Sequence, residues 1–222
     1  MTIGTKSILA ALAVGLVTAS AALAADPLDP KVKITATDQA HARAALLVRN
    51  DLGPAWVGGE RKPNALKLPV CPAQHPDDSD LTISGHTEAV FNNGNGGIQV
   101  DSDVVILRSA KQVDTQFNRI LQPKLATCLK YDLFKSVGGT NVIIGKVTRL
   151  DLAKVGTHSA LFRVALIYKT GKTGVDVISD FMFLGQGRTE WFVNVVAPAS
   201  VDSQLVALEN RIARTLVKRA RV

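Results

Sequence analysis

Four strand-like segments in the last third of the chain constrain its fold more than any other feature. They span residues 141–150, 159–169, 175–184 and 189–197. Four-residue, glycine-flanked connections, 171–174 and 185–188, separate the last three. Connections this short join only antiparallel neighbours, because a parallel crossover needs a dozen or more residues. Residues 161–168 are apolar on both faces apart from Arg163, which is typical of a central strand.

A second strand pair is expected earlier in the chain, where polar and apolar residues alternate with a period of two. Small or apolar residues at 83, 85, 89 and 91 alternate with polar ones, and a second alternating run covers 98–106. The Asn/Gly-rich segment 92–97 between them suits a turn that needs positive φ. The two runs predict a β-hairpin with one buried face, which brings the expected strands to six.

Helical spacing of apolar residues is found before and after this hairpin. Thr35 or Thr37 can cap a first helix of about residues 38–52. Ser109 can cap a second helix, which Pro123 interrupts before a further helical turn.

A third helix is predicted at the end of the chain, with Ser200 as its cap. Its inward face consists of Val201, Leu205, Leu208, Ile212 and Leu216. The Pro- and Gly-rich segment 55–80 predicts a long surface loop. Residues 25–222 are therefore expected to form a single α+β domain, a largely antiparallel six-stranded sheet covered by helices in an α/β sandwich.

Residues 1–24 have the pattern of a secretory signal peptide. A basic residue, Lys6, precedes the apolar run 8–17, and Ala22-Leu23-Ala24 has the form of a cleavage site. A lipid anchor would need Cys directly after that site, where Ala25 stands. No later segment has the apolar length of a membrane span. The protein is therefore expected to be secreted, extracellular or periplasmic, and free of a membrane anchor.

Cys71 and Cys128 are the two cysteines of the chain. In an exported protein, an even pair is most simply a disulfide, and this one would close a long loop. The alternative is a redox-active or nucleophilic thiol. Neither cysteine belongs to a C-x-x-C motif, and no histidine is close to Cys128 in the sequence, which favours the disulfide.

Motifs for the common catalytic chemistries are missing from the sequence. It has no G-x-S-x-G elbow, no phosphate-binding G-x-x-x-x-G-K-[ST] loop, no G-x-G-x-x-G and no H-E-x-x-H. We therefore expect no cofactor, no metal site and no catalytic residues. Asp77, Asp78 and Asp80 could hold a hard cation, but a solvated turn-forming loop explains them more simply.

Two further groups of charged residues suggest alternatives. His86 and Glu88 share the polar face of the first hairpin strand and could act as an acid–base pair in an exposed hydrolase site. Arg163 and Asp176 or Asp180 on neighbouring strands are expected to form a structural ion pair.

The formal net charge is +7, and basic residues concentrate on the last helix. They recur every three or four residues as Arg211, Arg214, Lys218 and Arg221. A solvated outer helix face accounts for this spacing, and the functional alternative is a patch for an anionic envelope polymer, a membrane surface or an acidic partner. Nucleic acid is not expected as a partner, because the chain has few aromatic residues for base stacking.

The order of elements over residues 80–216 resembles a known family. The features that carry the resemblance are residues 104–107, the helix opening Ser109-Ala110-Lys111, the segment Ala126-Thr127-Cys128 and the strand 191–196 before the closing helix. The chain resembles the extracellular sensor domain of actinobacterial receptor serine/threonine kinases and related envelope lipoproteins. That resemblance implies an α/β sandwich on an antiparallel sheet, stapled by disulfides, that binds or senses a ligand.

The sequence therefore predicts a secreted, non-enzymatic binding or sensor-like domain with an unknown envelope ligand or protein partner. We expect the ligand in a cleft between sheet and helices or at the 55–80 loop. An extracellular hydrolase that uses His86 and Glu88 and an electrostatic adaptor that uses the basic last helix are the two alternatives.

Overall fold

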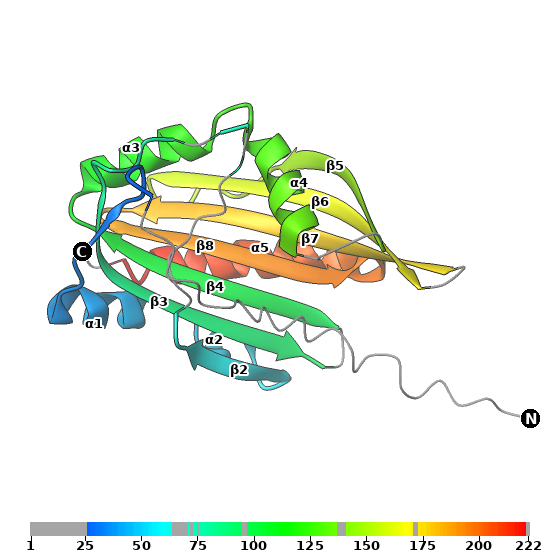
Figure 1. The fold of residues 1–222 in the computed structure, drawn as a ribbon. Coiled ribbons are helices and arrows are strands. Elements are labelled where there is room, and N and C mark those ends of the chain that lie inside the picture. Colours follow the sequence, from blue (N-terminus) through cyan, green and yellow to red (C-terminus); the bar gives the residue numbers. More distant parts are fainter. Residues whose placement is uncertain are drawn as a thin grey trace, which may run out of the picture.

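One mixed, mostly antiparallel sheet organises the chain, in the computed structural model that describes residues 26–63, 71, 73, 74, 76–94, 97–136, 141–170 and 173–220. Seven of its eight strands follow the order β1-β3-β4-β8-β7-β6-β5, and β2 also pairs with β3. Helices lie on both faces of the sheet (Figure 1). The expected α+β class with a largely antiparallel sheet is confirmed. The predicted signal peptide lies outside the described residues.

The strands expected from alternation and short turns are all present. The hairpin consists of β3 (Thr82–Asn93) and β4 (Ile98–Leu107). The later strands are β5 (Val142–Leu150), β6 (His158–Thr170), β7 (Thr173–Gln186) and β8 (Thr189–Pro198). β6, predicted to be central, pairs on both sides but is next to the edge strand β5.

The prediction of six strands is wrong, because two more strands pair with β3. β1 (Lys31–Val32) runs parallel to it, and β2 (Trp56–Arg61) runs antiparallel within the segment that we expected to be a loop. Gly58 in β2 has φ +129°, and a Cβ there would lie 2.0 Å from the Val90 carbonyl oxygen. The glycine that indicated a loop instead permits close approach of two strands.

The first helix is shorter than predicted. Thr35 caps α1 (Ala36–Ala45), and its side chain accepts a hydrogen bond from the Asp38 amide. A separate turn, α2 (Arg49–Leu52), follows. The predicted single helix is broken by Leu46 and Leu47, which leave the helical path and are buried in the core.

The later helices follow the prediction except at one cap. Ser109 caps α3 (Ala110–Ile120), and α4 (Leu125–Ser136) begins after Pro123. α5 (Asp202–Val217) is preceded by the 3-10 turn η2 (Ala199–Val201), so the predicted Ser200 cap is wrong. In the part of the chain that the structure describes, no helix is long and apolar enough to cross a membrane.

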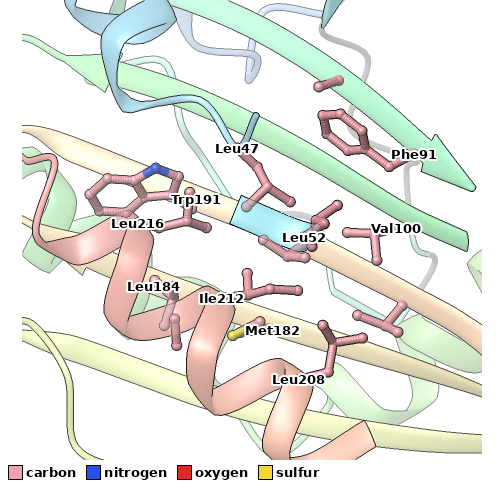
Figure 2. Packing of buried hydrophobic residues seen from close by; sticks show 14 of the residues in the cluster. Leu47, Leu52, Phe91, Val100, Met182, Leu184, Trp191, Leu208, Ile212 and Leu216 are labelled. Carbon is pink, nitrogen blue, oxygen red and sulfur yellow. The ribbon is translucent and has the colours of Figure 1, made fainter. Parts of the chain in front are cut away.

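The larger core lies between the sheet and the helices α1, α2 and α5. Figure 2 shows Leu208, Ile212 and Leu216 of α5 packed in one cluster with Met182 and Leu184 of β7. The expected inward face of the last helix is thus buried, with Val201 partly buried at its start. The indole nitrogen of Trp191 donates to the Ala45 carbonyl at 3.0 Å and fixes α1 to the sheet.

A second core lies on the opposite face, beneath α3 and α4 (Figure 1). Its buried side chains are Ile83, Leu107, Val113, Phe117, Leu125, Leu129, Ala160, Val164, Leu166, Val177, Phe181 and Phe183. The sheet is therefore buried on both faces over its interior strands.

Charged residues are buried in the larger core, between β7 and α5. Arg163 donates to both carboxylate oxygens of Asp180, with an Nε–Oδ1 distance of 2.7 Å, and also to Asp202. This confirms the expected ion pair with Asp180, whereas Asp176 is exposed. Glu209 of α5 is fully buried beside them, and neither of its carboxylate oxygens has a hydrogen-bond partner among the described residues.

Burial raises the pKa of Glu209 to about 9, and the neighbouring Asp180 carboxylate adds to the shift. Folded protein therefore holds a proton on Glu209 at pH values where the unfolded chain has released it. Because the folded state binds the extra proton, the free energy of unfolding falls as pH rises from the unfolded pKa toward 9.

We predict that Glu209→Gln removes this decline. The variant should unfold at a higher urea concentration than wild type, with a gain on the order of 5 kcal/mol near pH 8.5 and a gain of about 1 kcal/mol near pH 5. Urea titrations followed by circular dichroism at several pH values measure the free energy of unfolding of both proteins. Asp176→Asn, at an exposed carboxylate of the neighbouring strand β7, is the control and should leave the pH profile unchanged. Parallel profiles for wild type and Glu209→Gln would contradict the assignment.

Candidate functional site

Five charged or titratable side chains gather on one face of β2, β3 and β4. This charged cluster consists of Arg61, His86, Glu88, Asp101 and Asp103. Arg61 and Asp103 both stand opposite Glu88 in the strand register, one on each side. Neighbouring strands therefore bring together residues that are up to 42 positions apart in the sequence, from Arg61 to Asp103.

Direct contacts connect the members of the charged cluster. The Nε2 atom of His86 lies 2.9 Å from Asp103 Oδ1 and 3.7 Å from Glu88 Oε1. Arg61 Nε donates to Glu88 Oε2 at 2.9 Å, and Arg61 Nη2 lies 3.8 Å from Asp101 Oδ1. One imidazole nitrogen thus faces carboxylate oxygens of two strands.

His86 and Glu88 share a face, as predicted, but these two side chains are not open to solvent, whereas Arg61 and Asp103 beside them are partly exposed. The two residues are 5 % and 7 % exposed. The expectation of an exposed acid–base pair is therefore wrong. The alternation predicted one buried face for β3, and Thr87 and Phe91 on that face are fully buried, but His86 and Glu88 on the opposite face are buried as well. A strand buried on both faces keeps polar side chains only where they are paired, as they are here.

Negative charge exceeds positive charge in this cluster. Three carboxylates face one guanidinium, so the net charge is −2 when His86 is neutral and −1 when it is protonated. Burial raises the pKa of Asp101, and a hydrogen bond from Gln99 at 2.7 Å opposes that shift. This excess is opposite in sign to the +7 of the whole chain.

Helix α1 holds the backbone at His86. Gln39 donates to the His86 carbonyl at 2.7 Å and accepts from the His86 amide at 3.2 Å. α1 approaches β3 so closely that a Cβ on Gly85 would lie 2.3 Å from the Asp38 carbonyl oxygen. Arg188 fixes Asp38 through a 2.7 Å hydrogen bond. The packing of α1 against β3 thus fixes the main chain at His86, and with it the position from which the imidazole extends.

Sequence reasoning missed Glu190 of β8. It stands opposite Val105, which in turn stands opposite His86. Glu190 is buried, its Oε1 has no hydrogen-bond partner among the described residues, and burial raises its pKa well above the ordinary value. The sequence signal that could have revealed it is a carboxylate within a mostly apolar strand.

The acidic loop that could have held a hard cation is instead occupied by an arginine. Arg119 of α3 binds Asp78 at 3.0 Å and both oxygens of Asp80 at 2.7 and 3.0 Å. Asp78 is buried rather than solvated. The loop is therefore an ion-paired attachment of residues 78–80 to α3.

The predicted disulfide between Cys71 and Cys128 is confirmed, with a Cα–Cα distance of 5.3 Å. It ties the segment before β3 to α4. Next to it, the Gln74 side chain donates to the Arg119 carbonyl, a second attachment of this segment to α3. The bond is consistent with an oxidising compartment.

A groove of about 780 Å³ lies between this stapled segment and the α3–α4 turn. Its described lining offers amide, hydroxyl and cationic groups and contains no carboxylate, imidazole or thiol. The lining residues are Ala73, Gln74, Pro76, Thr115, Asn118, Arg119, Gln122, Pro123 and Lys124. The volume is in the range of small-molecule sites, and the amide and cationic groups of the lining can form hydrogen bonds with a ligand.

Three members of the predicted basic patch lie on the surface of α5. Arg211, Arg214 and Lys218 are exposed, and Arg221 lies outside the described residues. Arg219, which the sequence did not single out, instead bonds both carboxylate oxygens of Asp51, at 2.8 and 2.6 Å. At this end of the chain, three basic side chains therefore face solvent, whereas Arg219 forms an ion pair within the protein.

No protein-family model matches the chain, and neither does any curated protein. The resemblance to kinase sensor domains therefore stays a prediction.

We predict that the Cys71→Ser/Cys128→Ser variant is less stable than wild type by about 4 kcal/mol, because the bond closes a 57-residue separation. Urea unfolding under oxidising conditions measures the difference. Adding a reductant should destabilise wild type to the level of the variant and leave the variant unchanged. If oxidised wild type and the variant were equally stable, the prediction that this disulfide stabilises the protein would be wrong.

Proposed function

We propose that this protein is a secreted, non-enzymatic binding domain that holds a polar envelope ligand in the groove beside the disulfide. The observation that carries the proposal is the groove itself, which the stapled segment and the α3–α4 turn form together. Residues 1–24 supply the expected export signal. The likeness to sensor domains supports the same class of function.

The groove lining favours binding over acid–base catalysis. Its described residues provide no general base, and the hydroxyl of Thr115 already donates to the Lys111 carbonyl at 2.9 Å. Lys124 and the amide of Asn118 suit an anionic or polyhydroxylated ligand, whereas the Gln122 amide already donates to the Asn118 carbonyl. Arg119 is held by Asp78 and Asp80, so it shapes the groove more than it supplies free charge.

The hydrolase alternative has less support. It depends on His86 and Glu88, which are buried and engaged with Asp103 and Arg61. A substrate would have to displace these contacts before it reached the imidazole.

Native mass spectrometry of the protein from its own secreted fraction tests the binding proposal. We expect a mass excess that is lost on denaturation. Asn118→Ala/Lys124→Gln should lose this ligand, because both side chains line the groove. The matched control, Lys130→Gln/Gln204→Ala, alters one lysine and one amide on exposed helix positions and should retain it. A bare wild-type chain, or equal retention by both variants, would contradict the proposal.

The exposed basic face of α5 favours a second candidate, an electrostatic adaptor on an anionic envelope surface. Arg211, Arg214 and Lys218 have no ion-pair partner among the described residues. Positive side chains on one helix face attract anionic lipid headgroups or polymers, and salt weakens that attraction.

We predict that wild type sediments with vesicles containing phosphatidylglycerol and is released between about 50 and 300 mM NaCl. Arg211→Gln/Arg214→Gln/Lys218→Gln should bind at least about tenfold more weakly, since each basic residue near the surface adds about 1 kcal/mol. Arg108→Gln/Lys111→Gln/Lys130→Gln removes the same charge from exposed positions elsewhere and should bind nearly as wild type. Salt-insensitive binding, or equal loss in both triple variants, would exclude the α5 face as the docking surface.

A further inference from the structure

Three side chains of the charged cluster offer ligand atoms that converge on one point. They are the Nε2 of His86 and one carboxylate oxygen each from Glu88 and Asp103, all within 4.8 Å of one another. We propose that these three residues bind a divalent transition-metal ion, with Zn²⁺ as the reference ion. This site is separate from the groove and does not depend on the function proposed for it.

The ligand set selects the class of metal. An imidazole nitrogen with two carboxylates suits Zn²⁺ and its transition-metal neighbours, whereas Ca²⁺ and Mg²⁺ prefer oxygen ligands alone. Zn–N and Zn–O bonds of about 2.0–2.2 Å place neighbouring ligand atoms roughly 3.3–3.5 Å apart. The observed distances from Nε2, 2.9 Å to Asp103 and 3.7 Å to Glu88, lie on either side of that spacing. Small side-chain rotations would bring both oxygens into coordination.

The surrounding residues hold these ligands in place. Glu88 and Asp103 stand opposite each other in the β3–β4 register. Arg61 binds Oε2 of Glu88 at 2.9 Å, so Oε1 is the oxygen turned toward the imidazole. Gln39 fixes the backbone at His86. Partners of this kind, which orient the ligands without touching the metal, are a regular part of metal sites.

Burial and the number of ligands also suit a metal ion. His86 and Glu88, the two central members of the cluster, are more than nine-tenths buried, so an ion bound between them would be largely shielded from water. Three protein ligands would leave a further coordination position for water or an external ligand.

A second histidine–carboxylate pair in the structure provides the comparison. His158 Nε2 lies 2.7 Å from Asp114 Oδ1, but it faces a single carboxylate, and Asp114 is more than half exposed. Among the described residues, His86, Glu88 and Asp103 are the one group of three that meets the geometry for a metal ion. The His158 pair is therefore a matched control with two of the three ligands.

Isothermal titration of the purified secreted chain with ZnCl₂, after treatment with a chelator, tests the site. We expect one equivalent to bind to wild type and to raise its melting temperature. His86→Gln and Glu88→Gln should each weaken the affinity by at least about 10- to 100-fold, because the loss of a direct ligand costs no less than the loss of a residue that only orients one. Asp114→Asn/His158→Gln should bind as wild type. Circular dichroism of each variant without metal shows whether it is folded.

Absence of one-equivalent Zn²⁺ binding to wild type would overturn the proposal. Unchanged affinity in folded Glu88→Gln, which preserves the size of the side chain, would do so too. Loss of binding in Asp114→Asn/His158→Gln with retention in His86→Gln would place the ion at the other pair. Native mass spectrometry tests the ligand in the groove, whereas the zinc titration tests the charged cluster. Either the binding proposal or the metal proposal can therefore fail while the other stands.

Discussion

Burial of the sheet on both faces is the constraint on which the rest of this structure depends. A strand in the interior of such a sheet has no side that faces water, so an ionised side chain on it is costly unless it has a partner within the protein. Asp180 meets this requirement through Arg163 on one face. His86 and Glu88 meet it through Asp103 and Arg61 on the other. The positions of the ion pairs thus follow from the packing of the two cores.

Local signals in the sequence were sufficient for most of the fold. Short connections and alternation predicted β3 to β8, because turn length and side-chain period are properties of neighbouring residues. The cap at Ser109 is local in the same way. β2 was missed because Gly58 is needed for contact with Val90, a partner 32 positions later that the sequence does not mark. The break after α1 has a similar origin, since Leu46 and Leu47 turn into a core built by distant strands.

The sites were less predictable than the fold. The period of two placed His86 and Glu88 on one face, but it carried no information about Asp103 or Arg61, which the pairing of separate strands brings to them. Glu190 and Glu209 went unnoticed because burial of a carboxylate depends on what packs over it. The disulfide could be predicted because the sequence has two cysteines, which allow a single pairing, and an N-terminal pattern that predicts export. The basic residues of the last helix were evident from the sequence. That Arg219 forms an internal ion pair, while other basic residues face solvent, depends on Asp51, which the sequence does not connect to it.

The amide of Gln39 has a consequence for the solubility of the chain. On the edge of β3 away from β4, β1 pairs at Thr82 and Ile83 and β2 pairs from Glu88 onward, so no strand of the described residues lies on that edge between the two. The Gln39 side chain bonds the amide and carbonyl of His86 within that gap, as a neighbouring strand would. Exposed strand edges invite other chains to add as new strands. One side chain on a helix thereby closes the opening through which a second molecule could extend the sheet at β3.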